Sequence, residues 1–101
     1  MESKLLLAAA FSALSFAAAA QDPAVARSLA ATCAGCHGTD GRSATASVAP
    51  LAGMPKDHLI AQMQLFRDGK RPATVMHQLA KGYTDAQIDL IAAYFAAQPK
   101  K

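Results

Sequence analysis

The 101-residue sequence contains no tryptophan and only two cysteines, and aromatic residues make up 6% of it. Basic and acidic side chains are interspersed, with a formal net charge of +3. There is no block of like charges of the kind that binds nucleic acid, so no nucleic-acid partner is expected. No segment alternates apolar and polar residues for long enough to predict a strand. These absences favour a small all-α domain.

Large apolar side chains are scarce in the part of the chain expected to fold. After the first 20 residues the only aromatic side chains are Phe66, Tyr83, Tyr94 and Phe95. A domain of this size buries too little surface to be comfortably stable without a disulfide, a metal or another staple. The sequence therefore predicts that a prosthetic group completes the core.

The N-terminus has the parts of a secretory signal peptide. Lys4 supplies a positive charge, residues 5–19 form an apolar run broken only by serines, and residues 18–20 are small. We expect cleavage near Ala20, export to the periplasm, and one small domain over residues 21–101. The alternative is that the segment is retained as an anchor. No later stretch approaches the roughly 20 apolar residues that span a membrane, so no stable membrane insertion is expected after cleavage.

One pentapeptide, Cys33-Ala34-Gly35-Cys36-His37, has a spacing that is specific for one chemistry. Two thiols separated by two residues reach both vinyl groups of one porphyrin, and the histidine after them lies beneath the iron as an axial ligand. The pattern predicts one covalently attached haem c per chain, with Cys33 and Cys36 as thioether anchors and His37 as an iron ligand. Attachment of this kind is generally completed outside the bacterial cytoplasm, which agrees with the export signal.

Two other classes of site use a C-x-x-C pair. A zinc site usually needs a second pair of cysteine or histidine ligands, and the remaining histidines, His58 and His77, are far apart in the sequence. A redox-active dithiol expects a strand before the motif and a βαβ pattern around it, whereas an alanine-rich segment of helical period precedes Cys33. Haem attachment is the preferred interpretation, and these two are its alternatives.

Periodicity and capping signals predict four helices separated by loops. The first has Asp22 as N-cap and delivers Cys33, and the stretch from Thr39 to Pro50 is typical of a loop. Thr84 and Gln87 form a capping box at the start of the last helix. The expected helices are Pro23 to about Thr32, Pro55 to Gly69, Ala73 to Lys81 with Gly82 as cap, and Thr84 to Pro99.

A haem iron bound by His37 needs a ligand on its other face. Met63 shares a helix face with apolar residues, which indicates a core position, and Met54 follows His37 closely in the chain. Met76 comes after a whole helix has had room to cross one haem edge, so it is the preferred ligand. His77, its neighbour on a helix, points about 100° away, and bis-histidine ligation is the alternative to a surface position. The candidates are Met54, Met63, Met76, His58 and His77.

Several segments together carry a family resemblance. They are residues 29–38, LAATCAGCHG; residues 49–53, APLAG; residues 66–71, FRDGKR; Met76; and residues 88–95. These segments resemble the small monohaem class I cytochromes c of bacteria. Residues 74–83, TVMHQLAKGY, are further similar to the haem subunit of flavocytochrome c sulfide dehydrogenase.

The resemblance implies the class I cytochrome c fold, with short helices around one covalently attached haem. The first and last helices of this fold cross, so Leu29 should meet Tyr94 or Phe95. Two positions depart from the family pattern: Ala26 stands where a glycine is common, and Tyr83 replaces a smaller residue of many relatives. Tyr83 is expected to be either a hydrogen-bond donor at the haem edge or a packing residue.

The resemblance also implies roles at the site. Pro50 matches the proline whose carbonyl accepts a hydrogen bond from the second ring nitrogen of the axial histidine. Leu51 would lie against the porphyrin, and Met76 matches the family's sixth ligand. The expected cofactor-binding residues are Cys33, Cys36, His37, Pro50, Leu51 and Met76, with His37 and Met76 as metal ligands.

With both faces of the iron occupied, the implied function is electron transfer rather than catalysis. We expect a soluble carrier or the cytochrome subunit of a dehydrogenase, including a sulfide- or sulfur-oxidising flavocytochrome c. Its partners would be redox proteins: a flavoprotein dehydrogenase subunit, and a terminal oxidase or another cytochrome. The alternative is a five-coordinate c-type haem protein that binds small gases or has weak peroxidase activity, which requires that Met76 is not a ligand.

Overall fold

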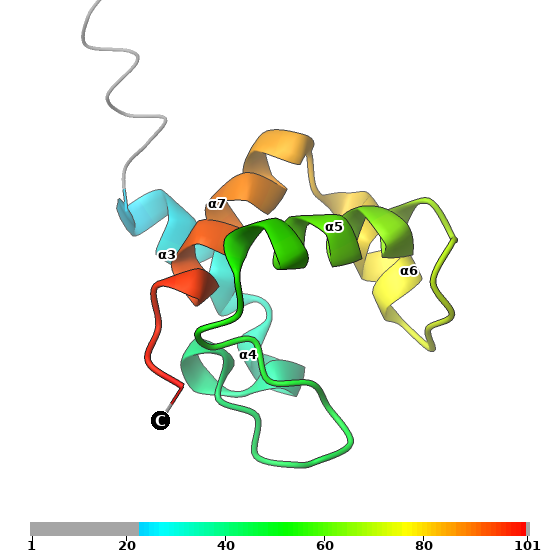
Figure 1. Cartoon of the computed structure of the whole chain (residues 1–101). Coiled ribbons are helices and arrows are strands. Elements are labelled where there is room, and N and C mark those ends of the chain that lie inside the picture. The colour runs from blue at the N-terminus through cyan, green and yellow to red at the C-terminus, as the bar shows by residue number, and fades with distance from the viewer. Residues whose placement is uncertain (1–22, 101) are drawn as a thin grey trace, which may run out of the picture.

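The computed structural model describes residues 23–100, and the expected signal peptide and the N-cap Asp22 lie outside them. All regular structure in the described part is helical, so the predicted all-α class is confirmed (Figure 1). None of the helices in this part is long and apolar enough to cross a membrane. The elements are α3 (Pro23–Ala31), α4 (Ala34–His37), η1 (Thr39–Gly41), α5 (Lys56–Arg67), α6 (Met76–Leu79), η2 (Ala80–Gly82) and α7 (Asp85–Ala96).

The core lies where α3 meets α7, and α5 also packs against α7. Ala30 of α3 is 2% exposed, and it joins one buried cluster with Leu59 of α5 and with Ile91, Ala92 and Phe95 of α7. Leu29 and Tyr94 pack against this cluster, as the expected helix crossing requires. The methyl group of Ala26 is also buried in α3, so the crossing accommodates a side chain where a glycine is common.

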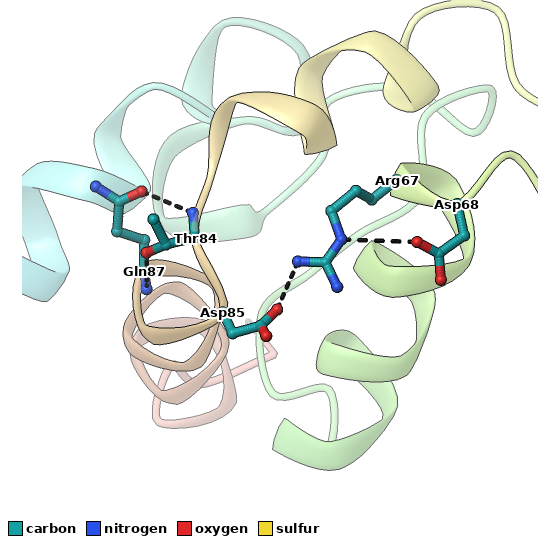
Figure 2. A network of polar contacts seen from close by, with 5 residues as sticks. All are labelled: Arg67, Asp68, Thr84, Asp85 and Gln87. Atoms are coloured by element: carbon teal, nitrogen blue, oxygen red, sulfur yellow. Dashed lines mark hydrogen bonds and ion pairs between the residues drawn. The ribbon is translucent and has the colours of Figure 1, made fainter.

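Two ion pairs join α5 to α7, and a capping box stands at the start of α7. Lys56 Nζ lies 3.1 Å from Asp89 Oδ1, and Arg67 Nη1 donates to Asp85 Oδ1 at 2.5 Å. Figure 2 shows Arg67 reaching from α5 towards the first turn of α7, where the side chains of Thr84 and Gln87 form the predicted capping box. The last helix therefore begins where the sequence indicated.

The bounds of α5 differ slightly from the prediction. Pro55 is the N-cap, with φ −57° and ψ 135°, and not the first helical residue. Its ψ is extended, so the first turn starts at Lys56. At the other end Gly69 has φ 70° and follows the last helical turn, as expected for a helix stop.

The third predicted helix is shorter than residues 73–81, because regular helix starts only at Met76. Gly82 was expected as its cap and this is wrong: the chain continues through η2, and Gly82 belongs to that turn. The turn ends at Tyr83, whose backbone is extended, with φ −120° and ψ 139°. The segment from Met76 to Gly82 packs against α5.

Periodicity did not indicate two short turns between the first and second predicted helices: α4, which precedes the predicted loop, and η1, which lies at its start. Gly41 closes η1 with φ 80°, and a Cβ there would lie 2.7 Å from the Ala52 nitrogen and 2.9 Å from Phe95 Cδ1. Asp40 also has a positive φ of 54°, and its carboxylate accepts a hydrogen bond from Tyr94. This contact and the close approach at Gly41 hold the loop against α7.

Candidate haem site

The C-x-x-C-H segment forms one helical turn at the end of α3. The Cys33 nitrogen donates to the Ala30 carbonyl at 3.1 Å, and the His37 nitrogen donates to the Cys33 carbonyl at 2.9 Å. Both cysteines are free thiols, with Cys33 half-buried and Cys36 exposed. The three side chains predicted to hold the cofactor therefore project from a single short turn.

The environment of the thiols bears on the two alternative interpretations. Burial raises the pKa of the Cys33 thiol, and the Thr32 hydroxyl opposes this only in part. A redox-active C-x-x-C pair depends on a lowered thiol pKa, so the dithiol alternative is disfavoured. For zinc, residues 23–100 contain no gathering of three or more histidine, cysteine or acidic side chains that could hold a metal ion.

One hydrogen bond orients the imidazole of His37. Its Nδ1 lies 2.6 Å from the carbonyl oxygen of Ala49. A carbonyl only accepts, so Nδ1 carries the proton, and in the neutral imidazole Nε2 then keeps a free lone pair. This is the tautomer in which Nε2 can bind iron.

The acceptor of this bond differs from the one expected. Pro50 was predicted to supply the carbonyl, but Ala49, one residue earlier, supplies it. The proline ring disfavours helical backbone at the residue before it, so Pro50 restrains Ala49 and acts on the bond only through its neighbour. The sequence signal that would have found Ala49 is its position directly before a proline.

The loop that carries this carbonyl is fixed at three points. The backbone nitrogens of Leu51 and Ala52 donate to the Gly41 carbonyl at 2.9 and 3.1 Å, and the Gly53 nitrogen donates to the Phe95 carbonyl at 2.9 Å. Leu51 is half-buried and packs on the core cluster. The orientation of His37 is thus connected through the main chain to α7.

The second predicted ligand, Met76, is the first residue of α6 and is half-buried. The apolar side chains near it are unusually open: Val75 is 53% and Leu79 52% exposed. Among the other candidates, Met54 packs against the core cluster and Met63 is half-buried in α5. Met76 therefore lies beside the two most exposed large apolar side chains of the described residues.

The two histidine candidates, His58 and His77, differ in burial. His58 is exposed, as expected. His77 was expected at the surface but is half-buried, and its Nδ1 is buried without a hydrogen-bond partner. The reason is that α6 packs against α5, which covers part of the helix that carries His77.

The donor set fits a covalently attached haem. Two free thiols and an imidazole with a free Nε2 lie on one turn, and uncovered apolar side chains flank a half-buried thioether on another element. An apolar disc bound covalently at the first site would give the second one the cover it lacks. A small helical domain with this attachment turn defines a c-type cytochrome.

Comparison with known proteins identifies the family. Residues 20–95 match the family described as cytochrome c oxidase, cbb3-type, subunit III, and the chain belongs to this cytochrome c family. It is 46% identical over 74 residues to the cytochrome subunit of sulfide dehydrogenase from Chlorobaculum tepidum, covering 72% of this chain and 66% of that protein. It is 41% identical over 80 residues to cytochrome c4 from Pseudomonas aeruginosa, covering 79% of this chain and 40% of that one.

A solved structure shares the fold. Thiosulfate dehydrogenase from Marichromatium purpuratum superposes with a TM-score of 0.73 and 35% identity, over 78% of this chain and 20% of that one. The chain thus spans from a fifth to about two thirds of the length of these relatives. The predicted class I cytochrome c fold and the likeness to the sulfide dehydrogenase subunit are confirmed, and haem c is the group that this family implies.

Proposed function

We propose that this chain is a periplasmic electron-transfer protein with one haem c, bound covalently by Cys33 and Cys36 and ligated by His37 and Met76. The observation that carries the proposal is the 2.6 Å hydrogen bond from His37 Nδ1 to the Ala49 carbonyl. It leaves Nε2 free on the same turn as the two thiols, which is the requirement for an axial ligand.

The roles of the residues follow from their chemistry. When bound, haem c supplies an iron that gains or loses one electron. The Cys33 and Cys36 thiols would fix the group to the turn after α3, and the Ala49 carbonyl keeps the His37 ring in place. Met76 offers a soft thioether that favours ferrous iron and so raises the reduction potential.

The apolar residues around these ligands would exclude water. Leu51 would lie against one side of the porphyrin, and Val75 and Leu79, both more than half exposed, are available to cover it near Met76. With His37 and Met76 both bound to the iron, no coordination site would remain open for a substrate. Electrons would therefore leave through an exposed edge, where a small, weak docking surface suffices.

A spectroscopic experiment tests the ligation. The ferric protein should be low-spin with the weak red charge-transfer band of methionine sulfur, and the reduced protein should not take up carbon monoxide. Met76→Ala should remove the band and open the iron to carbon monoxide, while the matched controls Met54→Ala and Met63→Ala should keep it. High-spin iron in the wild-type protein that binds carbon monoxide would instead support the five-coordinate alternative.

The similar proteins support a proposal about the partner. We propose that the chain accepts electrons from a dehydrogenase of reduced sulfur compounds, as its bound cytochrome subunit or as a soluble carrier. The support is the similarity to the cytochrome subunit of sulfide dehydrogenase and to the thiosulfate dehydrogenase structure. Purification of the tagged chain from the native periplasm separates the two forms: a subunit elutes with a flavoprotein, and a carrier elutes alone.

Export is tested on the same preparation. Intact mass of the periplasmic protein should correspond to a chain that starts near Gln21 with one haem added. A membrane fraction that holds a chain starting at Met1 would show that residues 1–20 are retained as an anchor.

A further inference from the structure

One hydrogen bond joins the turn that follows Met76 to the turn that carries the haem cysteines. Tyr83 Oη lies 2.7 Å from Thr32 Oγ1, although the two residues are 51 positions apart. Thr32 directly precedes Cys33, and Tyr83 directly follows η2, which continues α6 from Met76. The bond therefore spans the two segments that would hold opposite faces of the haem.

The direction of this bond can be assigned. Thr32 Oγ1 donates to the Leu29 carbonyl at 2.9 Å. A hydroxyl has one proton and a carbonyl only accepts, so Tyr83 must be the donor to Thr32. Thr32 Oγ1 also lies 4.0 Å from Cys33 Sγ, so the pair is next to a thioether anchor. The order of donation is Tyr83 to Thr32 to the last turn of α3.

The surroundings make this bond a fixed point of the segment. The Tyr83 ring packs against the core cluster, and Ala80 is fully buried, whereas Val75 and Leu79 are more than half exposed. Met76 lies between these two exposed residues, near the start of the segment. At the opposite end, the Tyr83 hydroxyl is tied to α3.

We propose that Tyr83 is a positioning residue: by donating to Thr32 it fixes the Met76 segment relative to the haem attachment turn and so keeps Met76 on the iron. This inference rests on the proposed His37 and Met76 ligation. Of the two roles expected for Tyr83, packing and hydrogen bonding, the ring performs the first and the hydroxyl the second, but towards Thr32.

The test removes the bond from either side in the haem-loaded protein. Tyr83→Phe keeps the ring and Thr32→Val keeps the shape, and each deletes one partner. Imidazole should then displace Met76 from ferric iron at about fivefold lower concentration, as expected from the loss of one net hydrogen bond. When the pH is raised, the red methionine band should also disappear at a lower pH than in the wild-type protein. The double variant should be no worse than either single one, because both remove the same bond.

Two controls separate positioning from general stability. Thr32→Ser keeps the hydroxyl and should restore wild-type imidazole affinity. Tyr94→Phe deletes the other tyrosine hydroxyl, which donates to Asp40, and should lower the melting temperature without changing imidazole affinity.

The outcomes distinguish this inference from the function on which it rests. If Tyr83→Phe and Thr32→Val only lower the melting temperature and leave imidazole affinity and the pH profile of the band unchanged, the positioning role is overturned and the ligation stands. If the wild-type protein shows no methionine band, both proposals are overturned. Weakened Met76 binding in both variants, with recovery in Thr32→Ser, supports the positioning role.

Discussion

The helix crossing and the methionine segment of this domain are packed in opposite ways. At the helix crossing, where α3 meets α7, Ala30 and Phe95 are each 2% exposed. In the methionine segment, residues 75–82, Val75 and Leu79 are 53% and 52% exposed. The crossing builds a core from protein alone, and its small alanines allow close approach. The methionine segment packs against α5 but leaves Val75 and Leu79 uncovered, so a bound haem would add to its stability.

Loss of both thioether anchors should have the largest effect, and it tests whether the methionine segment depends on haem while the helix crossing does not. Cys33→Ser combined with Cys36→Ser should abolish covalent haem, so that the denatured protein no longer stains for haem on a gel. Hydrogen exchange should then become fast in residues 75–82 before it does in α7, because only the former lose their apolar cover. Equally slow exchange in both regions would contradict the division. Cys36→Ser alone, which keeps one anchor, is the control.

Truncation of the largest buried side chain tests the helix crossing itself. Phe95→Ala should lower the free energy of unfolding by about 3–5 kcal/mol, because it leaves a cavity in a packed cluster. Denaturant unfolding followed by circular dichroism measures this. Leu65→Ala, at a position that is 36% exposed, should cost less than about 1 kcal/mol. Similar losses for the two would show that Phe95 is not central to the core.

A methyl group at Gly41 should disturb the junction between the crossing and the haem loop. Gly41→Ala should cost about 2–3 kcal/mol, because φ is 80° and the new Cβ would lie 2.7 Å from the Ala52 nitrogen. Gly82→Ala is the matched control, since nothing lies within 4 Å of its Cβ position and its φ is not positive. Thermal or denaturant unfolding measures both losses. A larger loss of stability in Gly82→Ala than in Gly41→Ala would refute the tight junction.

A polar residue in the methionine segment tests whether haem covers its apolar side chains. Leu79→Ser should cost about 1–2 kcal/mol in the haem-loaded protein and almost nothing in haem-free protein, because a bound haem would bury Leu79. Val25→Ser on α3, at a position 42% exposed, should have the same small effect in both forms. Parallel unfolding curves of loaded and haem-free protein give both values. Equal losses for Leu79→Ser in the two forms would mean that Leu79 faces solvent.

The capping box should give the smallest effect. Thr84→Ala removes the acceptor for the Gln87 nitrogen, 3.2 Å away, and should cost about 1 kcal/mol. Thr84→Ser keeps the oxygen and should be close to wild type. Neither imidazole binding nor the red methionine band should change, because the cap stabilises α7 and does not contact the site. A shift of the red band in Thr84→Ala would contradict this.

The parts of the fold that follow from local chemistry were predictable from the sequence. The capping box at Thr84 and the apolar period of the last helix placed α7, and Pro23 and Gly69 marked helix ends that the structure confirms. The short turn α4 was missed because four residues that include a glycine have no measurable period. Gly82 failed as a cap because the chain goes on into a tighter turn rather than into a left-handed residue.

The site was predictable as a set of residues but not as a set of contacts. Spacing identifies Cys33, Cys36 and His37, because their chemistry requires neighbouring positions. It does not determine which carbonyl meets the imidazole, since a shift of one residue in the loop exchanges Pro50 for Ala49. The bond between Thr32 and Tyr83 left no trace in the sequence, because two hydroxyls 51 residues apart form no repeating pattern.

The bond from His37 to Ala49 has a consequence for how the protein tolerates mutation. Its acceptor is a main-chain oxygen, which every amino acid at position 49 retains. No side-chain replacement there can delete the interaction that selects the tautomer of His37. Changes that move the loop, such as those at Gly41, can still disturb it. The tautomer of His37 is thus insensitive to side-chain substitutions at position 49, the point of contact, and sensitive to substitutions at a distance, where the loop is held in place.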